Sequence, residues 1–149
     1  MQRYERTQHA TWAWLVLLPV GLIVAAFFQS PNPETFWVML TACALVILAL
    51  AAFTRLTIRV DATAITWAFG WGWPASALRL ADIERCEITR TNFLEGWGLH
   101  WTIWHGWLWN VAGFQAVEIF KRGGARVTLG TDDPQGLWEA IERFRKGGA

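Results

Sequence analysis

The sequence predicts an α+β membrane protein in which two membrane-spanning helices precede a β-rich domain closed by a C-terminal helix. Three observations predict this fold class. Two long uncharged apolar runs lie before residue 54, alternating apolar and polar residues follow from residue 55, and an apolar stripe at helical spacing ends the chain. The chain has 149 residues, of which 54% are apolar and 17% charged, enough for about one domain.

Each uncharged run is long enough to cross a bilayer. The first spans residues 10–28 and the second spans residues 36–53, and the turn-forming connector QSPNPET joins them. At 1.5 Å per residue, the first run would form a helix of about 28 Å, close to the ~30 Å hydrocarbon core. Neither run has the polar stripe of a soluble helix. A cleaved signal peptide is the alternative for the first run, but a second apolar run follows it and a small-residue cleavage site does not.

Positive charges flank the two predicted spans on one side only. Arg3 and Arg6 precede the first span, Arg55 and Arg59 follow the second, and the connector carries Glu34 without any Lys or Arg. Because cytoplasmic flanks are enriched in positive charge, we expect both termini in the cytoplasm. The predicted parts are an N-terminal segment (1–9), two transmembrane helices (10–54) and a cytoplasmic domain (55–149).

The part of the chain after residue 55 shows the two-residue periodicity of β-strands. Seven short strands are predicted, at 56–60, 65–69, 77–80, 83–90, 99–104, 116–121 and 126–129. Gly123 and Gly124 form a two-residue hairpin signal between the last two strands. Asp133 and Pro134 fit the N-cap and first position of a final helix. Its apolar stripe consists of Leu137, Ile141 and Phe144. We expect a small barrel or sandwich with this helix across one end.

Five segments combine turn and packing residues in a specific order. They are LTIRVDATAITWAFGWGWP from Leu56, LADIERCEI from Leu80, the GWG at 96–98, NVAGFQAVEI from Asn110 and RVTLGTDDPQGLWEAI from Arg126. With the preceding membrane hairpin, they resemble a bacterial pleckstrin-homology-like (PH-like) membrane protein over roughly residues 56–144. The resemblance implies a seven-stranded, partly open β-barrel or sandwich capped by a C-terminal helix, in a multi-pass protein of the bacterial inner membrane. Eukaryotic relatives of this fold bind phosphoinositides through a basic cluster at the first hairpin. Here that hairpin offers only Arg55 and Arg59, which the topology already explains, so this function is not carried over.

Charge and motif content argue against several classes of function. The formal net charge of +1 lacks the basic excess of a nucleic-acid-binding protein. Neither serine lies in a nucleophile motif. Cys86, His100 and His105 match no zinc-ligand spacing, and His9 is better explained as an interfacial polar residue than as a pigment or haem ligand. We therefore predict no enzymatic activity, catalytic residue, metal, cofactor or small-molecule substrate.

Tryptophan is the unusual feature of the composition, with 12 residues. Five of them fall within residues 97–109. A small domain buries few large aromatic side chains, so we assign Trp67, Trp101 and Trp138 to the core. The other indoles are expected at the surface, where exposed aromatic clusters contact a bilayer interface or another protein. The candidate interface residues are Trp71, Trp73, Trp97, Trp104, Trp107 and Trp109.

Two hypotheses of function follow from these features. The first is a non-catalytic membrane-anchored scaffold or accessory subunit that docks on a larger membrane protein complex, such as a respiratory, photosynthetic or transport assembly. Its partners would be the lipid bilayer and that complex. The alternative is a peripheral lipid- or peptide-binding PH-like module, which should present a basic pocket or an open groove.

Overall fold

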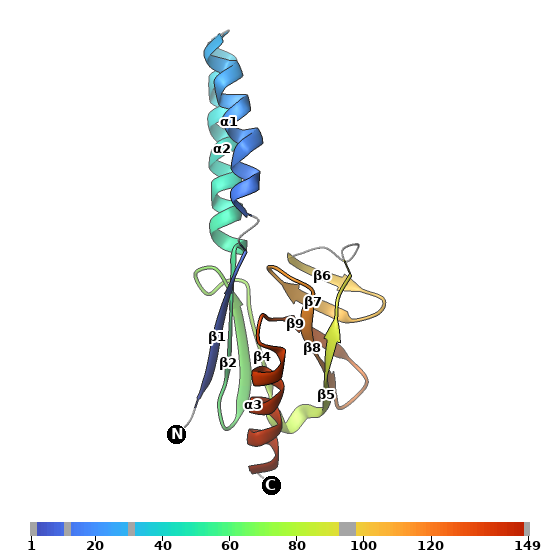
Figure 1. Ribbon diagram of the computed structural model, residues 1–149. Helices are drawn as coiled ribbons and strands as arrows, with labels where there is room; N and C mark the ends of the chain where they lie inside the picture. Colours follow the sequence, from blue (N-terminus) through green and yellow to red (C-terminus); the bar gives the residue numbers. More distant parts are fainter. Residues whose placement is uncertain (1–2, 11–12, 30–31, 93–97, 148–149) are drawn as a thin grey trace.

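The computed structural model describes residues 3–10, 13–29, 32–92 and 98–147, which form a helical hairpin standing on a β-rich domain (Figure 1). The helices are α1 (Ala13–Gln29), α2 (Pro33–Phe53) and α3 (Pro134–Gly147), with a short 3₁₀ helix, η1 (Leu80–Asp82). The strands are β1 (Tyr4–His9), β2 (Arg55–Val60), β3 (Ala64–Phe69), β4 (Ala75–Arg79), β5 (Ile83–Arg90), β6 (Gly98–Thr102), β7 (Gly106–Asn110), β8 (Gln115–Lys121) and β9 (Arg126–Gly130).

Helices α1 and α2 occupy the two apolar runs and project from the domain (Figure 1). The second helix starts earlier than predicted because the Asn32 side chain accepts a hydrogen bond from the Glu34 N–H and Pro33 takes the first position. Within the described residues, one helical stretch, Glu34–Phe53, is long and apolar enough to cross a membrane, and none of it is buried inside the protein. Leu15–Phe28 in α1 is a shorter apolar stretch.

Sheet A has the strand order β1-β2-β3-β4, and all its pairs are antiparallel. Strand β1 was not predicted. Its residues facing the domain interior include the polar Tyr4 and Gln8, so it lacks an apolar alternation, and β2 is the strand with which it pairs. The β-domain therefore contains residues from both sides of the helical hairpin, and residues 4–9 belong to it.

Sheet B has the order β5-β8-β9-β7-β6, in which only the β7–β9 pair is parallel. The expectation of one strand over 99–104 is wrong, because the chain turns at residues 103–105 and returns as β7. Gly106 makes this return, with φ at +66° and no room for a Cβ beside the Arg126 carbonyl oxygen. Gly123 and Gly124 lie in a longer loop than predicted, since the Lys121 N–H bonds to the Ala125 carbonyl.

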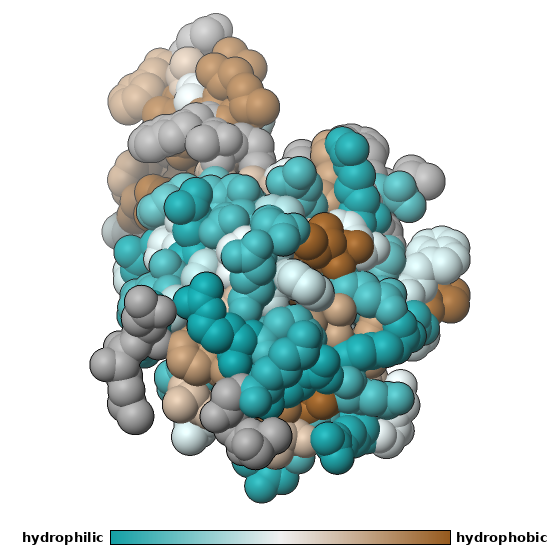
Figure 2. Space-filling model, turned by 60° about the horizontal axis from the view of Figure 1, so that its bottom comes forward, coloured by the Kyte–Doolittle hydropathy of each residue, from teal (hydrophilic) through white to brown (hydrophobic). Residues whose placement is uncertain are grey.

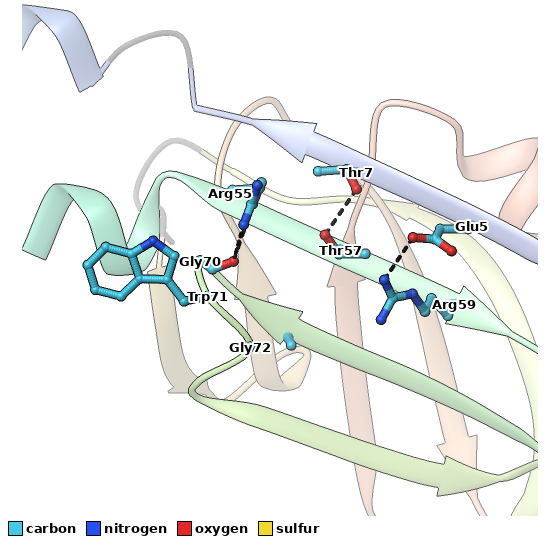
Figure 3. Close-up of a pocket in the computed structure, with 9 residues that line it drawn as sticks. Glu5, Thr7, Arg55, Thr57, Arg59, Gly70, Trp71 and Gly72 are labelled. Carbon is cyan, nitrogen blue, oxygen red and sulfur yellow. Dashed lines mark hydrogen bonds and ion pairs between the residues drawn. The ribbon is translucent and has the colours of Figure 1, made fainter.

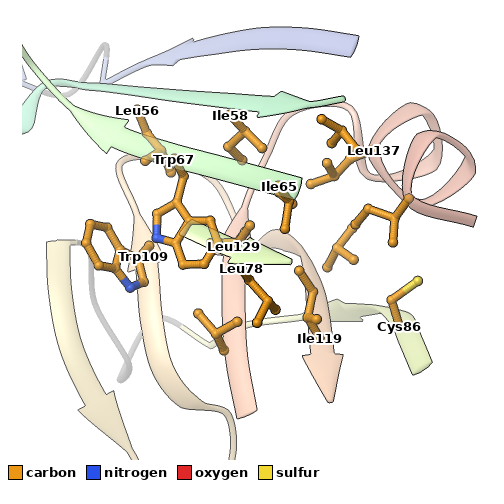
Figure 4. Packing of buried hydrophobic residues seen from close by; sticks show 14 of the residues in the cluster. Leu56, Ile58, Ile65, Trp67, Leu78, Cys86, Trp109, Ile119, Leu129 and Leu137 are labelled. Carbon is orange, nitrogen blue, oxygen red and sulfur yellow. The ribbon is translucent and has the colours of Figure 1, made fainter. Parts of the chain in front are cut away.

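The nine described strands thus form two separate sheets rather than a closed seven-stranded barrel. Their inner faces pack together around a core that includes Leu56, Ile65 and Leu129 (Figure 4). As predicted, α3 covers one side of this core, with Leu137 and Ile141 fully buried and Phe144 packed against the cluster. Its cap is also as predicted: Asp133 Oδ1 accepts a hydrogen bond from the Gly136 N–H at 3.0 Å.

Candidate functional site

The predicted interface tryptophans separate into an exposed set and a buried one. Trp71 and Trp73, in the β3–β4 loop, are 73% and 76% exposed, and Trp104 and Trp107 are also exposed. Trp109 is 8% exposed and belongs to the core, so its assignment to the surface is wrong. Trp97 lies outside the described residues.

The structure reverses the predicted locations of two tryptophans, because Trp109 lies in the core and Trp101 lies at the surface. Trp109 stacks on Phe69 with ring centroids 5.4 Å apart. It also meets Trp67 in a T-shaped contact at 5.8 Å (Figure 4). Trp101, which was expected in the core, is 60% exposed. Both residues face the inner side of sheet B, but only Trp109 has sheet A above it. The alternation of apolar residues along β6 and β7 does not show where sheet A, which covers the core, ends.

The loop that carries Trp71 and Trp73 is held against the end of α2. Its first residue, Gly70, has φ at +42°, and a Cβ there would lie 2.5 Å from the Ala52 carbonyl oxygen. The Gly70 N–H donates to the Arg55 carbonyl, and the Arg55 guanidinium returns a bond to the Gly70 carbonyl at 2.6 Å. The two exposed indoles are thereby fixed beside the foot of the helical hairpin.

A polar cavity of about 530 Å³ lies on the outer face of sheet A, next to this loop (Figure 3). Thr7 and Thr57 share a hydroxyl hydrogen bond of 3.0 Å across β1 and β2. Two residues further along the same two strands, the Arg59 guanidinium donates a hydrogen bond to the Glu5 carboxylate at 2.9 Å. Trp71 stands at the edge of the cavity (Figure 3).

The charges in this cavity already have partners. The hydrogen bond from Arg59 lowers the pKa of the Glu5 carboxyl, and the same bond raises the pKa of Arg59. The Arg55 guanidinium is bonded to a backbone carbonyl. These contacts brace β1, β2 and the β3–β4 loop against one another, so we assign the cavity a structural role in holding the domain to the hairpin.

A second charged cluster, which the sequence pattern did not indicate, lies on the outer face of sheet B. Glu118 is nearly buried, with Arg126 Nη1 at 3.3 Å and His105 Nδ1 at 3.6 Å from its carboxylate oxygens. Arg126 also donates to the Trp104 carbonyl at 2.8 Å, and Thr128 Oγ1 donates to the His105 carbonyl at 2.9 Å. The cluster therefore fixes the β6–β7 turn that presents Trp104.

The histidines and cysteine considered as metal ligands have separate surroundings. The Cys86 thiol donates to Glu142 Oε1 at 3.4 Å, whereas His105 lies beside Glu118. Burial raises the pKa of the Cys86 thiol to about 12, and the Glu142 carboxylate contributes to the rise. Burial acts to raise the pKa of Glu142 as well, but hydrogen bonds from Arg145 and Lys146 bring it below its ordinary value. Among the residues that the structure describes, no three His, Cys, Asp or Glu side chains are grouped as metal ligands.

Comparison with protein-family models, with curated proteins and with solved structures yields no significant match to this chain.

Proposed function

We propose that the chain is a non-catalytic, membrane-anchored docking module whose helical hairpin crosses the bacterial inner membrane twice. The observation that carries this proposal is the uncovered apolar surface of α1 and α2. Large apolar side chains on all sides of the hairpin are more than half exposed, among them Leu15, Leu18, Leu22, Ile23, Phe28, Trp37, Val38, Leu45, Ile47 and Leu48. Complete transfer of such a side chain out of water contributes at most roughly 1.5–3 kcal/mol, and these side chains would gain the part that corresponds to their exposed area. In Figure 2 the hairpin forms a brown column behind a mostly teal domain.

Helix lengths fit this placement. With 17 and 21 residues, α1 and α2 extend about 25 Å and about 31 Å, close to the thickness of a bilayer core. Four arginines flank the hairpin in the sequence: Arg3 and Arg6 precede α1, and Arg55 and Arg59 follow α2. By the positive-inside bias, both termini and the β-domain are cytoplasmic.

The domain would be held close to the bilayer surface. Strand β1 precedes α1 and strand β2 follows α2 after one residue, and the Ala10 N–H donates to the Thr54 carbonyl at 2.7 Å. The β1–β2 ladder therefore extends to the base of the hairpin and holds the domain close to it. Trp71 and Trp73, held beside α2, then lie at headgroup level, where indoles combine apolar contact with a hydrogen-bond donor.

The docking role rests on the second exposed aromatic surface, on the β6–β7 hairpin. Trp101, Ile103, Trp104 and Trp107 are all more than half exposed. Several exposed aromatic side chains on one hairpin are typical of a protein contact. We assign it to a larger membrane protein complex in which this chain is a scaffold or accessory subunit.

For the domain itself we propose a PH-like fold. Two packed sheets followed by one covering C-terminal helix support this assignment, whereas β1 and β7 add strands that the resemblance does not include. An experimental structure whose β2–β4 meander and α3 superimpose on a PH-like domain would support the proposal. A different connectivity would refute it.

Cysteine labelling in intact cells tests the topology. Both natural cysteines are replaced by serine, and a single cysteine is placed at Asn32, in the connector, or at Lys146, near the C-terminus. We expect an impermeant maleimide to label position 32 in spheroplasts and position 146 only after lysis. Labelling of position 146 in intact spheroplasts would reverse the orientation, and extraction of the protein by carbonate would refute the membrane hairpin.

The docking role is tested by mild detergent extraction, native gel separation and mass spectrometry. We expect discrete co-migrating proteins for the natural chain and their loss for the double variant Trp104→Ser/Trp107→Ser. The variant Trp71→Ser/Trp73→Ser is the matched control, because it removes two equally exposed indoles from the other surface. A lone monomer or dimer for the natural chain would contradict the docking role.

A further inference from the structure

The two sheets of the domain have unequal numbers of strands, which leaves part of the inner face of sheet B uncovered. Sheet A ends at β4, whereas sheet B continues to β7 and β6. The inner positions of these last strands pair Leu99 with Trp109 and Trp101 with Trp107. Trp109 is covered by Phe69 and Trp67, but Trp101 and Trp107 remain 60% and 53% exposed. They face the interior of the sandwich at a point where the described residues form no second layer.

Among the residues that the structure describes, no strand pairs with the outer edge of β4, which is the edge of sheet A at this opening. Phe69 N–H bonds to the Pro74 carbonyl and Leu80 N–H bonds to the Thr63 carbonyl, so even-numbered residues of β4 pair with β3. Because antiparallel pairing alternates, the N–H and C=O groups of Ala75 and Ala77 point to the free edge. The methyl side chains of Ala75 and Ala77 do not shield that edge, and the charged residue of β4, Arg79, lies at its end in an ion pair with Asp82.

A cleft of about 280 Å³ lies between this edge and sheet B, with Trp67 and Trp109 among its lining residues. Ser76 occupies the inward position of β4 opposite Trp67, and its small side chain leaves the cleft open. Trp107 forms an apolar wall. Lys121 also lines the cleft, and within the described part of the chain its ammonium group is in no ion pair.

We propose that this cleft binds an extended segment of a partner protein, which pairs with β4 as a fifth strand of sheet A. Alternate side chains of the segment are apolar and cover Trp101 and Trp107, while an acidic side chain pairs with Lys121. Main-chain hydrogen bonds to the edge supply affinity and the aromatic wall supplies specificity, as in other cases of strand addition. The inference rests on the proposed docking role and specifies the partner as an acidic, β-forming segment.

A selection of peptides against the intact protein tests this proposal. The full chain in lipid nanodiscs is exposed to a displayed library of random nine-residue peptides. We expect enriched peptides in which apolar residues alternate and an Asp or Glu occupies one end. Hydrogen exchange of the complex with a synthetic copy of one enriched peptide should show slowed amides at Ala75 and Ala77.

Variants of the cleft then distinguish it from other surfaces. Trp101→Ser and Trp107→Ser should each weaken binding of that peptide at least about tenfold, as for a buried aromatic contact. Lys121→Glu should change the selected end residue from acidic to basic. Trp71→Ser/Trp73→Ser, the control, should leave affinity unchanged. Thermal unfolding of each variant verifies that it is folded.

Several outcomes would overturn the inference. These are the absence of any enriched pattern, equal binding by the Trp101 and Trp107 variants, or protection at β1, the other edge of sheet A, in place of β4. Protection of β4 that rises with protein concentration and without peptide would identify a second copy of this chain as the occupant. None of these results alters the cysteine-labelling pattern of the hairpin, so that experiment tests the membrane anchorage independently.

Discussion

At the level of single residues, two successive inward-facing side chains of β7 have different roles. Trp107 and Trp109 both face the inner side of sheet B, yet Trp109 stacks on Phe69 while Trp107 remains exposed. The position of each indole relative to the end of sheet A decides whether it supports the core or is available to a partner.

Serine substitution at these two positions should therefore have very different costs. We expect Trp109→Ser to lower the free energy of unfolding by about 3–5 kcal/mol, as for a large core aromatic. Trp107→Ser should cost less than about 1 kcal/mol. Denaturant unfolding of the full chain in detergent, followed by circular dichroism, measures both. Similar losses for the two variants would contradict the different burial of the indoles.

The thiol of Cys86 illustrates a residue made inert by its surroundings. Its pKa of about 12 leaves little thiolate near neutral pH, because burial and the Glu142 carboxylate both disfavour the charge. In a Cys43→Ser background, we expect alkylation of Cys86 at pH 8 to be roughly 10³-fold slower in the folded than in the unfolded chain. Alkylation at similar rates in both states would contradict this expectation.

The same shift gives stability a defined pH dependence. Because the folded state holds the Cys86 proton more tightly, its contribution is fully present below the unfolded pKa near 9 and is lost as pH rises toward 12. The pKa of Tyr4 is also raised, by burial and by Asp133, which acts in the same direction. We therefore expect the thermal midpoint to fall above pH 9. A Cys86→Ala variant should fall less steeply.

At the scale of elements, β1 joins the segment before the hairpin to the domain after it. The Ala10 N–H bonds to the Thr54 carbonyl, so even-numbered residues of β1 pair with β2 and odd-numbered ones face the free edge. Side chains of β1 add further contacts, among them the Arg6–Asp132 ion pair at 2.9 Å and the hydrogen bond between Thr7 and Thr57.

Proline substitutions at Arg6 and Thr7 distinguish the backbone groups of β1 that pair with β2 from those at its free edge. Arg6→Pro removes a ladder donor and leaves the Ile58 carbonyl unpaired, which should cost about 1–3 kcal/mol and lower the thermal midpoint. Thr7→Pro removes only an N–H that faces the edge and should cost less. Arg6→Ala and Thr7→Ala correct for the lost side chains. If both prolines destabilise equally after this correction, the pairing register of β1 is wrong.

At the scale of the whole molecule, the hairpin and the C-terminal end of α3 lie at opposite ends (Figure 1). If the hairpin spans the bilayer, the β3–β4 loop lies at headgroup level and the end of α3 lies away from the membrane. The two ends of the domain should then differ in their access to lipid.

An environment-sensitive fluorophore tests this arrangement in nanodiscs. In a background without the natural cysteines, it is attached to a cysteine at Trp71 or, as the control, at Lys146. We expect blue-shifted emission and strong quenching by headgroup-labelled lipids at position 71 because of its place beside α2, and neither effect at position 146. Equal quenching at both positions would contradict a membrane-proximal β3–β4 loop.

The elements with local signals could be predicted from the amino-acid sequence. Both apolar helices, α3 with its Asp133 cap, and the strands with alternating apolar residues, such as β2 and β3, follow from periodicity and capping. The exposed state of Trp71 and Trp73 was also predictable, because a glycine-rich turn carries them.

Only the tertiary structure decided the rest, because those features depend on residues far apart in the chain. Strand β1 has no apolar alternation of its own and exists through its pairing with β2, some 50 residues later. The burial of Trp109 and the exposure of Trp101 depend on where sheet A ends. The proposed strand-binding cleft combines an edge of one sheet with side chains of the other. Local periodicity shows which face of a strand is apolar, but the packing of the two sheets determines whether that face is covered.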